Sequence, residues 1–343
     1  MVTIKEIARL ARVSTATVSN VLNNKAGAAG AAKAEEIHEL AKSLNYMPNI
    51  LARNLQQKKT NTIGIIAEDL TVFNTPEIVD GIDSFCEENN FEIILGNLRL
   101  FKRYNNDFTD TPKHHELLES MMRNMIAKQV EGIIYIGYHC REIIHIPPKV
   151  HIPFVYAYCY PKEEIYPCVM FDDEKAAKDV SKLLIEKGHK RIGLICGPVS
   201  SYHTQARLRG FKAALKEYNI KPDPGLIVYG DWERDSAYSL SCSLFDKKAT
   251  AIFSFNDLMA CGVYEQAEAR GLKVGKHISL FGFDNRDISL VNKPELSTVQ
   301  LPLSEIGRSC AEIILNQIKY QKTSRKKIYL PCTILERSSV IAI

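Results

Sequence analysis

The sequence lacks the long apolar runs and the cysteine patterns that mark membrane proteins and disulfide-rich proteins. No run approaches the roughly 20 apolar residues that a membrane-spanning helix needs. The first residues, Met1-Val2-Thr3-Ile4-Lys5-Glu6-Ile7, lack the apolar core of a secretory signal. The nine cysteines are scattered and form no Cys-x-x-Cys pair, so neither a disulfide framework nor a zinc ribbon is indicated. We therefore expect a protein of the reducing cytoplasm.

Enzyme signatures are missing as well. The chain has no Gly-x-x-x-x-Gly-Lys-Ser/Thr, His-Glu-x-x-His or Gly-x-Ser-x-Gly motif, and no Gly-x-Gly-x-x-Gly after a strand. The adjacent His114 and His115 would point about 100° apart on a helix, so they cannot chelate one metal together. His139 and Cys140 could ligate a metal only with distant partners. We expect no catalytic residues, no cofactor and no metal site.

The positive charge of the chain is concentrated at one end. The 343 residues are enough for two or three domains of about 150 residues each. Residues 1–60 carry nine basic and four acidic side chains, whereas the remainder carries 35 basic and 36 acidic ones. A small basic head on a near-neutral body indicates a module that binds a polyanion. Chance clustering of surface lysines is the alternative.

Residues 1–48 have the pattern of three short helices. A tight break at Arg12-Val13 separates the first two, and Ser14 is a good N-cap for the second, with Thr17 at the third helical position. The apolar residues that would share a helical face are Ile4, Ile7, Ala8 and Ala11, then Val18, Val21 and Leu22, then Ile37, Leu40, Ala41 and Leu44. Two short helices joined by about three residues are typical of a helix-turn-helix.

Residues 49–61 form a linker between this head and the body. The segment is polar except for Ile50, Leu51, Ala52 and Leu55, which would share a face in a helix. It is too short to be a stable helix alone in water, so it would need a partner to fold.

From residue 62 onward, short apolar strands alternate with helical stretches. The expected strands are 62–67, 91–96, 132–136, 154–158, 192–196, 226–229, 251–254 and 278–281, and the expected helices include 76–88, 114–127, 204–218, 234–246 and 257–270, with another near Asp173. Repeated βα units predict an α/β fold with parallel sheets. We expect two similar lobes, one of residues 62–160 with 300–325, the other of residues 161–299 with 326–343. Ligands bind at the carboxyl ends of such strands, here in a cleft between the lobes.

Several motifs, in the same order along nearly the whole chain, resemble those of the lac-repressor (LacI/GalR) family of bacterial transcription regulators. In the head they are Val2-Thr3-Ile4-Lys5-Glu6-Ile7-Ala8, Val13-Ser14-Thr15-Ala16-Thr17-Val18-Ser19 and Leu44-Asn45-Tyr46-Met47-Pro48-Asn49. In the body they are Gly188-His189-Lys190-Arg191-Ile192-Gly193, Arg207-Leu208-Arg209-Gly210-Phe211, Phe255-Asn256-Asp257 and Gly282-Phe283-Asp284-Asn285. The resemblance implies a helix-turn-helix head on a two-lobed, periplasmic-binding-protein-like body, and a homodimer or a tetramer on a palindromic operator.

The resemblance also implies which residues contact DNA. The base-reading positions are Thr15, Ala16 and Asn20, of which Ala16 could touch only apolar surface such as a thymine methyl. Thr3, Ser14, Thr17 and Ser19 could hold phosphates, and Asn49 and Arg53 are further expected DNA-binding residues. For Thr17 and Ser19, simple capping and solvation is the alternative. The linker resembles the hinge helix of the family, with Leu55 as a wedge in the minor groove; alternatively, Leu55 covers the body.

One stretch departs from the family pattern. Residues 26–34 contain eight Ala or Gly in nine, where the family has a hydroxyl cap and a Thr-Arg pair at the start of the third helix. We expect no hydroxyl cap there, a local loss of about 1 kcal/mol, and the absence of two usual phosphate contacts.

Transferred position by position, the family pattern places a set of side chains in the cleft. They are Asp69, Phe73, Asn74, Tyr158, Ser201, His203, Arg207, Trp232, Asn256 and Asp284. An aromatic plate beside Arg, Asn and Asp suits a pyranose, although a purine stacks equally well on it. Tyr158 stands where many sugar-binding members place an Asp, which puts a familiar hexose in doubt. The alternatives are a salt bridge between Arg207 and Asp284 that closes the lobes, and lobe packing for Trp232.

The sequence thus predicts an effector-controlled DNA-binding regulator, a repressor, with a sugar favoured over a purine as effector. The segment 97–113 is longer than the family usually has, and we expect surface decoration there rather than a lid over the pocket. One rival function is a solute-binding protein, which the basic head and the lack of a signal sequence argue against. The other is an enzyme on an α/β scaffold, which detectable turnover of a bound sugar or nucleoside would reveal.

Overall fold

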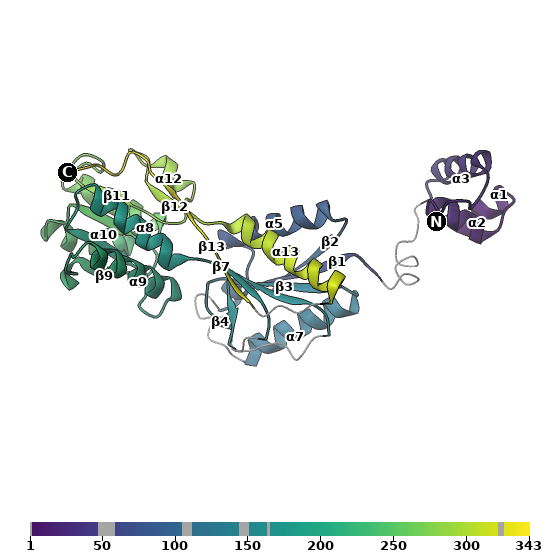
Figure 1. Ribbon diagram of the computed structural model, residues 1–343, viewed down its shortest axis with the longest axis horizontal. Coiled ribbons are helices and arrows are strands. Elements are labelled where there is room, and N and C mark those ends of the chain that lie inside the picture. Colours follow the sequence, from purple (N-terminus) through teal and green to yellow (C-terminus); the bar gives the residue numbers. More distant parts are fainter. Residues whose placement is uncertain (1, 47–58, 105–111, 144–150, 163–164, 322–325) are drawn as a thin grey trace. The chain divides into compact units, whose positions relative to one another are not determined.

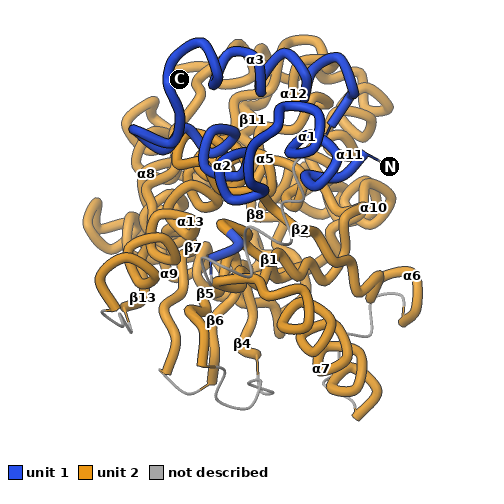
Figure 2. The backbone as a smooth tube through the Cα atoms, turned by 90° about the vertical axis from the view of Figure 1, so that its right-hand side faces the viewer, with its two compact units in different colours: residues 1–60 blue, residues 61–343 orange. Residues whose placement is uncertain are grey.

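The computed structural model describes residues 2–46, 59–104, 112–143, 151–162, 165–321 and 326–343. The chain forms two compact units, residues 1–60 and residues 61–343 (Figure 2). Residues 47–58, which include Asn49, Arg53 and Leu55 of the expected hinge, lie outside the described residues.

The described part of the first unit is helical. The helices α1 (Ile4–Leu10), α2 (Thr15–Leu22) and α3 (Ala31–Ser43) pack around a small core that includes Ile7, Val18 and Ile37. Arg12, in the break between α1 and α2, takes a positive φ of 52°. The Ser14 hydroxyl caps α2 by accepting a hydrogen bond from the Thr17 amide at 3.0 Å. The helix-turn-helix that the sequence predicts is therefore present.

The first lobe of the second unit is built on a six-stranded parallel sheet. Its strand order is β13-β7-β5-β3-β1-β2. The bounds are β1 (Thr62–Ala67), β2 (Glu92–Asn97), β3 (Gly132–Ile136), β5 (Phe154–Ala157), β7 (Cys168–Phe171) and β13 (Lys327–Leu330). The helices α5 (Asn74–Glu88) and α13 (Leu303–Tyr320) lie on one face of this sheet and α7 (Pro112–Ala127) lies on the other (Figure 1). The inner strands are apolar throughout because helices cover both of their faces.

Glycines allow α5 and α13 to approach closely. A Cβ added at Gly81 would lie 2.0 Å from the Ser304 carbonyl oxygen, and one at Gly307 would lie 2.0 Å from the Ile78 carbonyl oxygen. The two helices therefore pack backbone against backbone, which no larger residue permits at these positions.

The second lobe is built on a four-stranded parallel sheet with the order β11-β10-β8-β9. Its elements are α8 (Asp173–Glu186), β8 (Ile192–Cys196), α9 (Tyr202–Glu217), the 3-10 helix η1 (Pro224–Leu226), β9 (Ile227–Tyr229), α10 (Arg234–Asp246), β10 (Ala251–Ser254), α11 (Asp257–Ala269), β11 (Ser279–Phe281) and α12 (Ile288–Val291). The helices pack in pairs, α8 with α9 and α10 with α11. The βα alternation predicted from the sequence is confirmed in both lobes, with element ends shifted by one or two residues.

The chain crosses between the lobes near four short strands. β7 and β13 pair with each other in the first sheet, Phe171 opposite Leu330. β12 (Thr298–Gln300) pairs antiparallel with β14 (Thr333–Leu335), and Asp284 of the second lobe bridges to Gln300. The expected lobe boundaries near residues 160 and 325 are therefore wrong, because β7 and β13 complete the first sheet. The periodicity of a short apolar run does not reveal which sheet it joins.

The first lobe also contains two short strands and a short helix outside its main sheet. β4 (Glu142–Ile143) pairs with β6 (Tyr160–Pro161). The segment 97–113, expected as a loop, contains the short helix α6 (Leu100–Tyr104). Residues 105–111 lie outside the described residues.

Candidate DNA-reading helix and effector cleft

Helix α2 presents one exposed polar face. Thr15 and Ala16 are exposed, and Asn20 is half-buried one turn further along, while Val18 and Val21 face the core. Ala16 and Asn20 are four residues apart and so share a helical face, and Thr15 precedes Ala16 at the exposed start of the helix. The phosphate candidate Thr3 is exposed just before α1.

The hydroxyl groups around this face are partly engaged within the head. Ser14 Oγ lies 2.9 Å from Thr17 Oγ1 in addition to capping α2. The carbonyl oxygen of Ser19 accepts from Asn23 Nδ2 at 2.7 Å. Thr17 therefore has the capping partner that we gave as the alternative to a phosphate contact.

The Ala/Gly-rich stretch leads into an uncapped helix. Gly30 is the N-cap of α3, and no side chain caps this end. Lys33 bridges the first turn of α3 to the end of α1, because its Nζ donates to the Ala11 carbonyl oxygen at 3.2 Å and pairs with Glu36 at 2.6 Å. The expected absence of a hydroxyl cap is thus confirmed.

The ten predicted effector residues all lie where strands of the body end or the next helix begins. Asp69 follows β1, Tyr158 follows β5, Trp232 follows β9, Asn256 follows β10 and Asp284 follows β11. Phe73 and Asn74 are at the start of α5, whereas Ser201, His203 and Arg207 are at the start of α9. This is the edge at which parallel α/β sheets bind ligands.

Arg207 is the centre of a buried network on this edge. Its Nε donates to Asp173 Oδ1 at 2.6 Å, and its Nη1 donates to the Phe255 carbonyl oxygen. The guanidinium carbon lies 3.5 Å from the centre of the Phe283 ring. Arg207 Nη2 lies 3.8 Å from Asp284 Oδ1, but both residues belong to the second lobe, so this contact does not close the lobes as the alternative supposed.

The same network joins the two lobes through a histidine. His203 Nδ1 lies 2.8 Å from Asp173 Oδ2, and the Tyr158 hydroxyl of the first lobe lies 3.3 Å from His203 Nε2. Burial disfavours ionisation of Asp173, but His203 and Arg207 outweigh that effect and lower its pKa. Sequence reasoning missed Asp173, whose only signal is its place at the start of α8, directly after a strand.

Asp284 behaves differently from Asp173. Burial raises the pKa of Asp284 to about 8, and the nearby Arg207 offsets this only in part. The reason is that the guanidinium is already committed to Asp173 and the Phe255 carbonyl. Asp284 is therefore a neutral hydrogen-bond donor at neutral pH.

Trp232 is held over a glycine. A Cβ at Gly197 would lie 2.1 Å from the Trp232 ring, and Trp232 itself has a positive φ of 76°. Asn256 Nδ2 donates to the Trp232 carbonyl oxygen at 3.0 Å, while Asn256 Oδ1 caps α11 by accepting from the Met259 amide at 2.7 Å. Asn256 therefore positions Trp232 and the start of α11.

In the first lobe, the predicted effector residues differ in how many hydrogen bonds and contacts they make within the protein. Asp69 accepts from the Thr71 amide at 2.9 Å, the Thr71 hydroxyl at 2.7 Å and the Phe101 amide at 3.0 Å. The Phe73 ring is 39% exposed and lies 5.1 Å from the guanidinium of Arg286 in the other lobe. Asn74 is buried, and its Nδ2 has no hydrogen-bond partner among the described residues. An unpaired buried amide is costly unless something else satisfies it.

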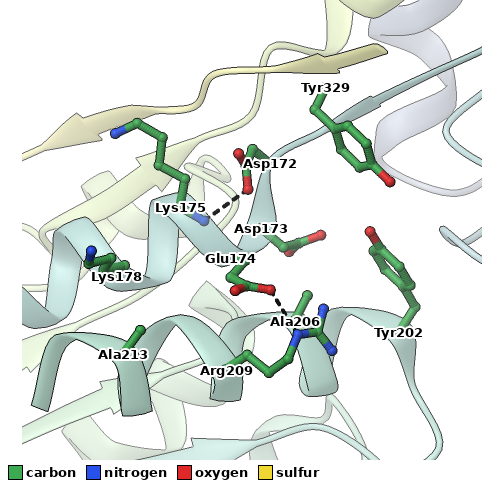
Figure 3. Close-up of a pocket in the computed structure, with 10 residues that line it drawn as sticks. All are labelled: Asp172, Asp173, Glu174, Lys175, Lys178, Tyr202, Ala206, Arg209, Ala213 and Tyr329. Atoms are coloured by element: carbon green, nitrogen blue, oxygen red, sulfur yellow. Dashed lines mark hydrogen bonds and ion pairs between the residues drawn. The ribbon is translucent and has the colours of Figure 1, made fainter. Parts of the chain in front are cut away.

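A separate pocket of about 420 Å³ lies between α8 and α9 (Figure 3). None of the ten predicted effector residues lines it; its lining is Asp172, Asp173, Glu174, Lys175, Lys178, Tyr202, Ala206, Arg209, Ala213 and Tyr329. Its basic groups already have acidic partners, since Arg209 pairs with Glu174 at 2.8 Å and Lys178 with Glu217 at 2.9 Å. Asp173 links this pocket to the Arg207 network.

The described residues hold no group of three or more His, Cys, Asp or Glu side chains that could bind a metal. No helix within the described ranges is long and apolar enough to cross a membrane.

The fold and the site define a two-part protein, in which a helix-turn-helix head precedes a periplasmic-binding-protein-like body. The profile "Bacterial regulatory proteins, lacI family" matches residues 3–49, and "Periplasmic binding protein-like domain" matches residues 182–340. The chain is 33% identical to catabolite control protein A of Priestia megaterium over 89% of both chains. It is 30% identical to the HTH-type transcriptional repressor PurR of Vibrio atlanticus over 99% of both chains.

The chain therefore belongs to the lacI family of bacterial transcription regulators. Its fold matches that of the lac repressor dimer bound to operator and an anti-inducer, with a TM-score of 0.79, 24% identity and coverage of 99% of both chains. The head is a DNA-binding domain and the body is an effector-binding domain.

Proposed function

We propose that this protein is a cytoplasmic transcription repressor that binds a palindromic operator as a homodimer or tetramer. In this proposal, the α2 face of Thr15, Ala16 and Asn20 reads base edges, and Thr3, Ser14, Thr17 and Ser19 position the head on the backbone. The exposed, polar face of α2, set on a core that Val18 and Val21 complete, is the observation that carries the DNA-binding half. Asn49, Arg53 and the Leu55 wedge belong to the hinge, which would bind the minor groove.

The effector in this proposal is a sugar bound between the lobes, and it controls operator affinity. The strand ends carry the Trp232 ring and Asp284, which is neutral at neutral pH and can donate to a hydroxyl group. Asn74 Nδ2 is a buried donor that a ligand oxygen would satisfy. Donors and acceptors around an apolar face are what a pyranose requires.

Operator binding by fluorescence anisotropy tests the DNA-binding half. A symmetric operator with a central CG step and a scrambled duplex of equal length would be compared at two salt concentrations. We expect tighter binding to the symmetric operator, with affinity falling steeply as salt rises because basic groups displace counterions. Equal affinity for both duplexes would contradict the proposal.

A further inference from the structure

The short helix α6 is clamped onto the cleft end of β1 in the first lobe. The Leu100 amide donates to the Glu68 carbonyl oxygen at 2.9 Å, and the buried Leu100 side chain fixes the start of the helix. Arg103 Nε donates to the Leu98 carbonyl oxygen at 3.1 Å. The described part of the long segment after β2 is therefore packed against the cleft edge and is not loose surface decoration.

Asp69 is the residue that holds this helix. Both of its carboxylate oxygens are used within the first lobe, Oδ1 by Thr71 and Oδ2 by the Phe101 amide at 3.0 Å. Burial would raise the pKa of Asp69, but these hydrogen bonds outweigh it and lower the pKa. These three hydrogen bonds occupy most of the roughly four acceptor positions of the carboxylate.

The Asp69–Phe101 bond places an aromatic pair at the same edge. The Phe101 ring stacks on Tyr138, with ring centres 6.1 Å apart and planes at 27°. Tyr138 follows β3, and its amide donates to Glu68 Oε2 at 2.7 Å. The Phe101 ring nevertheless remains 40% exposed.

Tyr138 of this pair lies near the second lobe. Tyr138 contacts His139 with ring centres 4.0 Å apart, and His139 lies 6.3 Å from His203 of the second lobe. Burial raises the pKa of Tyr138, and the carboxylates of Asp69 and of Glu233, in the second lobe beside Trp232, add to this effect. The Phe101–Tyr138 pair thus belongs to the first lobe and Trp232 to the second, and both lie at the ends of strands where the two lobes approach each other.

We propose that the Phe101–Tyr138 pair is the stacking surface for the apolar C–H face of the sugar, and that Asp69 is a positioning residue for it. Phe101 then determines specificity, because a ring face selects ligands with an apolar face and the hydroxyl groups at the rim. This role rests on the proposed sugar effector and adds residues from the inserted segment to the cleft.

The test uses the full chain with D-glucose, cellobiose, D-ribose and adenosine as probes. Trp232 is the only tryptophan, so its fluorescence reports binding directly, and calorimetry gives Kd. For the sugar that binds, we expect Phe101→Ala to raise Kd about tenfold, and Phe101→Tyr to restore it. Asp69→Asn should raise Kd and, without any sugar, speed amide hydrogen exchange at residues 101–103. Leu290→Ala, at an exposed position on α12, is the matched control and should change neither the Kd nor the amide exchange rates.

Two results would overturn different parts of the proposal. A sugar that binds wild type and Phe101→Ala equally well would remove the stacking role and leave the sugar effector standing. Binding of adenosine, or of no probe, by wild type would remove the sugar effector and this role with it.

Discussion

Asp173 and Asp284 both lie near Arg207, and yet their pKa values shift in opposite directions. Asp173 receives a 2.6 Å hydrogen bond from Arg207 and a contact from His203, whereas Asp284 lies 3.8 Å from the guanidinium and has little else. The pKa of Asp173 is lowered and that of Asp284 is raised to about 8. Asp284 therefore binds a proton in the folded protein at a pH where it is ionised in the unfolded chain.

This difference predicts how Asp284→Asn changes the pH dependence of stability. Between about pH 4 and the folded pKa of about 8, the folded state binds more protons at this site than the unfolded state. The stabilising contribution of Asp284 protonation to folding is fully present below about pH 4 and is lost as the pH rises toward 8. The free energy of unfolding of wild type should therefore fall relative to that of Asp284→Asn between pH 5 and pH 8. Urea unfolding of both proteins at three pH values measures this. A constant difference would show that Asp284 is ionised in the folded protein.

In the head, Asn20→Ala should reduce specificity more than affinity for DNA in general. A lost base contact costs about 1–3 kcal/mol on the cognate site, while scrambled DNA is bound through phosphates and should be unaffected. The matched control is His38→Ala, on a different helix, which should change neither affinity. Equal weakening on both duplexes would assign Asn20 to the backbone instead.

The sequence placed the candidate residues at the cleft edge but did not reveal their partners. Strand ends can be read from apolar runs, so Asp69, Trp232 and Asp284 fall at the predicted edge. Asp173 and Phe101 were missed because their roles depend on contacts with Arg207 and Asp69, which lie more than 30 residues away along the chain. Pairing at that distance leaves no periodic signal in one sequence.

At the scale of single elements, the uncapped start of α3 can be repaired. Gly30 has φ −64° and ψ 152°, values that serine adopts, and an added Cβ would have no neighbour within 4 Å. We expect Gly30→Ser to stabilise the head by about 0.5–1 kcal/mol, through the new cap and the stiffer unfolded chain. Gly27→Ser is the contrasting control. Gly27 has a φ of +75°, so a side chain at this position should lower the stability of the head. Thermal unfolding monitored in the head would rank the three proteins.

Replacing a glycine in the contact between α5 and α13 should destabilise the protein. In Gly307→Ala the new methyl group would lie 2.0 Å from the Ile78 carbonyl oxygen, so the helices must separate. Overpacking of this kind costs about 1–3 kcal/mol or more. Asn316→Ala, exposed on the same helix, should be close to neutral. Equal unfolding free energies for the two variants would contradict the backbone contact.

Element types were largely predictable, but sheet membership was not. Helical spacing and Ser14 predicted α1 and α2, and apolar runs predicted β1 and β3. β7 joins the first sheet by pairing with β5, and β13 joins it only by pairing with β7. That pairing joins residues about 160 positions apart, beyond the reach of any local pattern.

The whole molecule consists of a basic head and a two-lobed body. The first 60 residues carry the excess positive charge, and the body is near neutral. The network of Tyr158, His203, Asp173 and Arg207 crosses from one lobe to the other, so a ligand that changes lobe closure must act against it. Two sites in one protein that respond to a shared conformational change must influence each other equally.

A thermodynamic cycle tests whether operator binding by the head and sugar binding by the body are coupled. Operator affinity would be measured with and without a saturating sugar from the probe set, and affinity for that sugar would be measured with and without saturating operator. We predict that both affinities change, and by the same factor. A sugar that binds in the cleft while operator affinity stays constant would contradict the claim that the body controls the head.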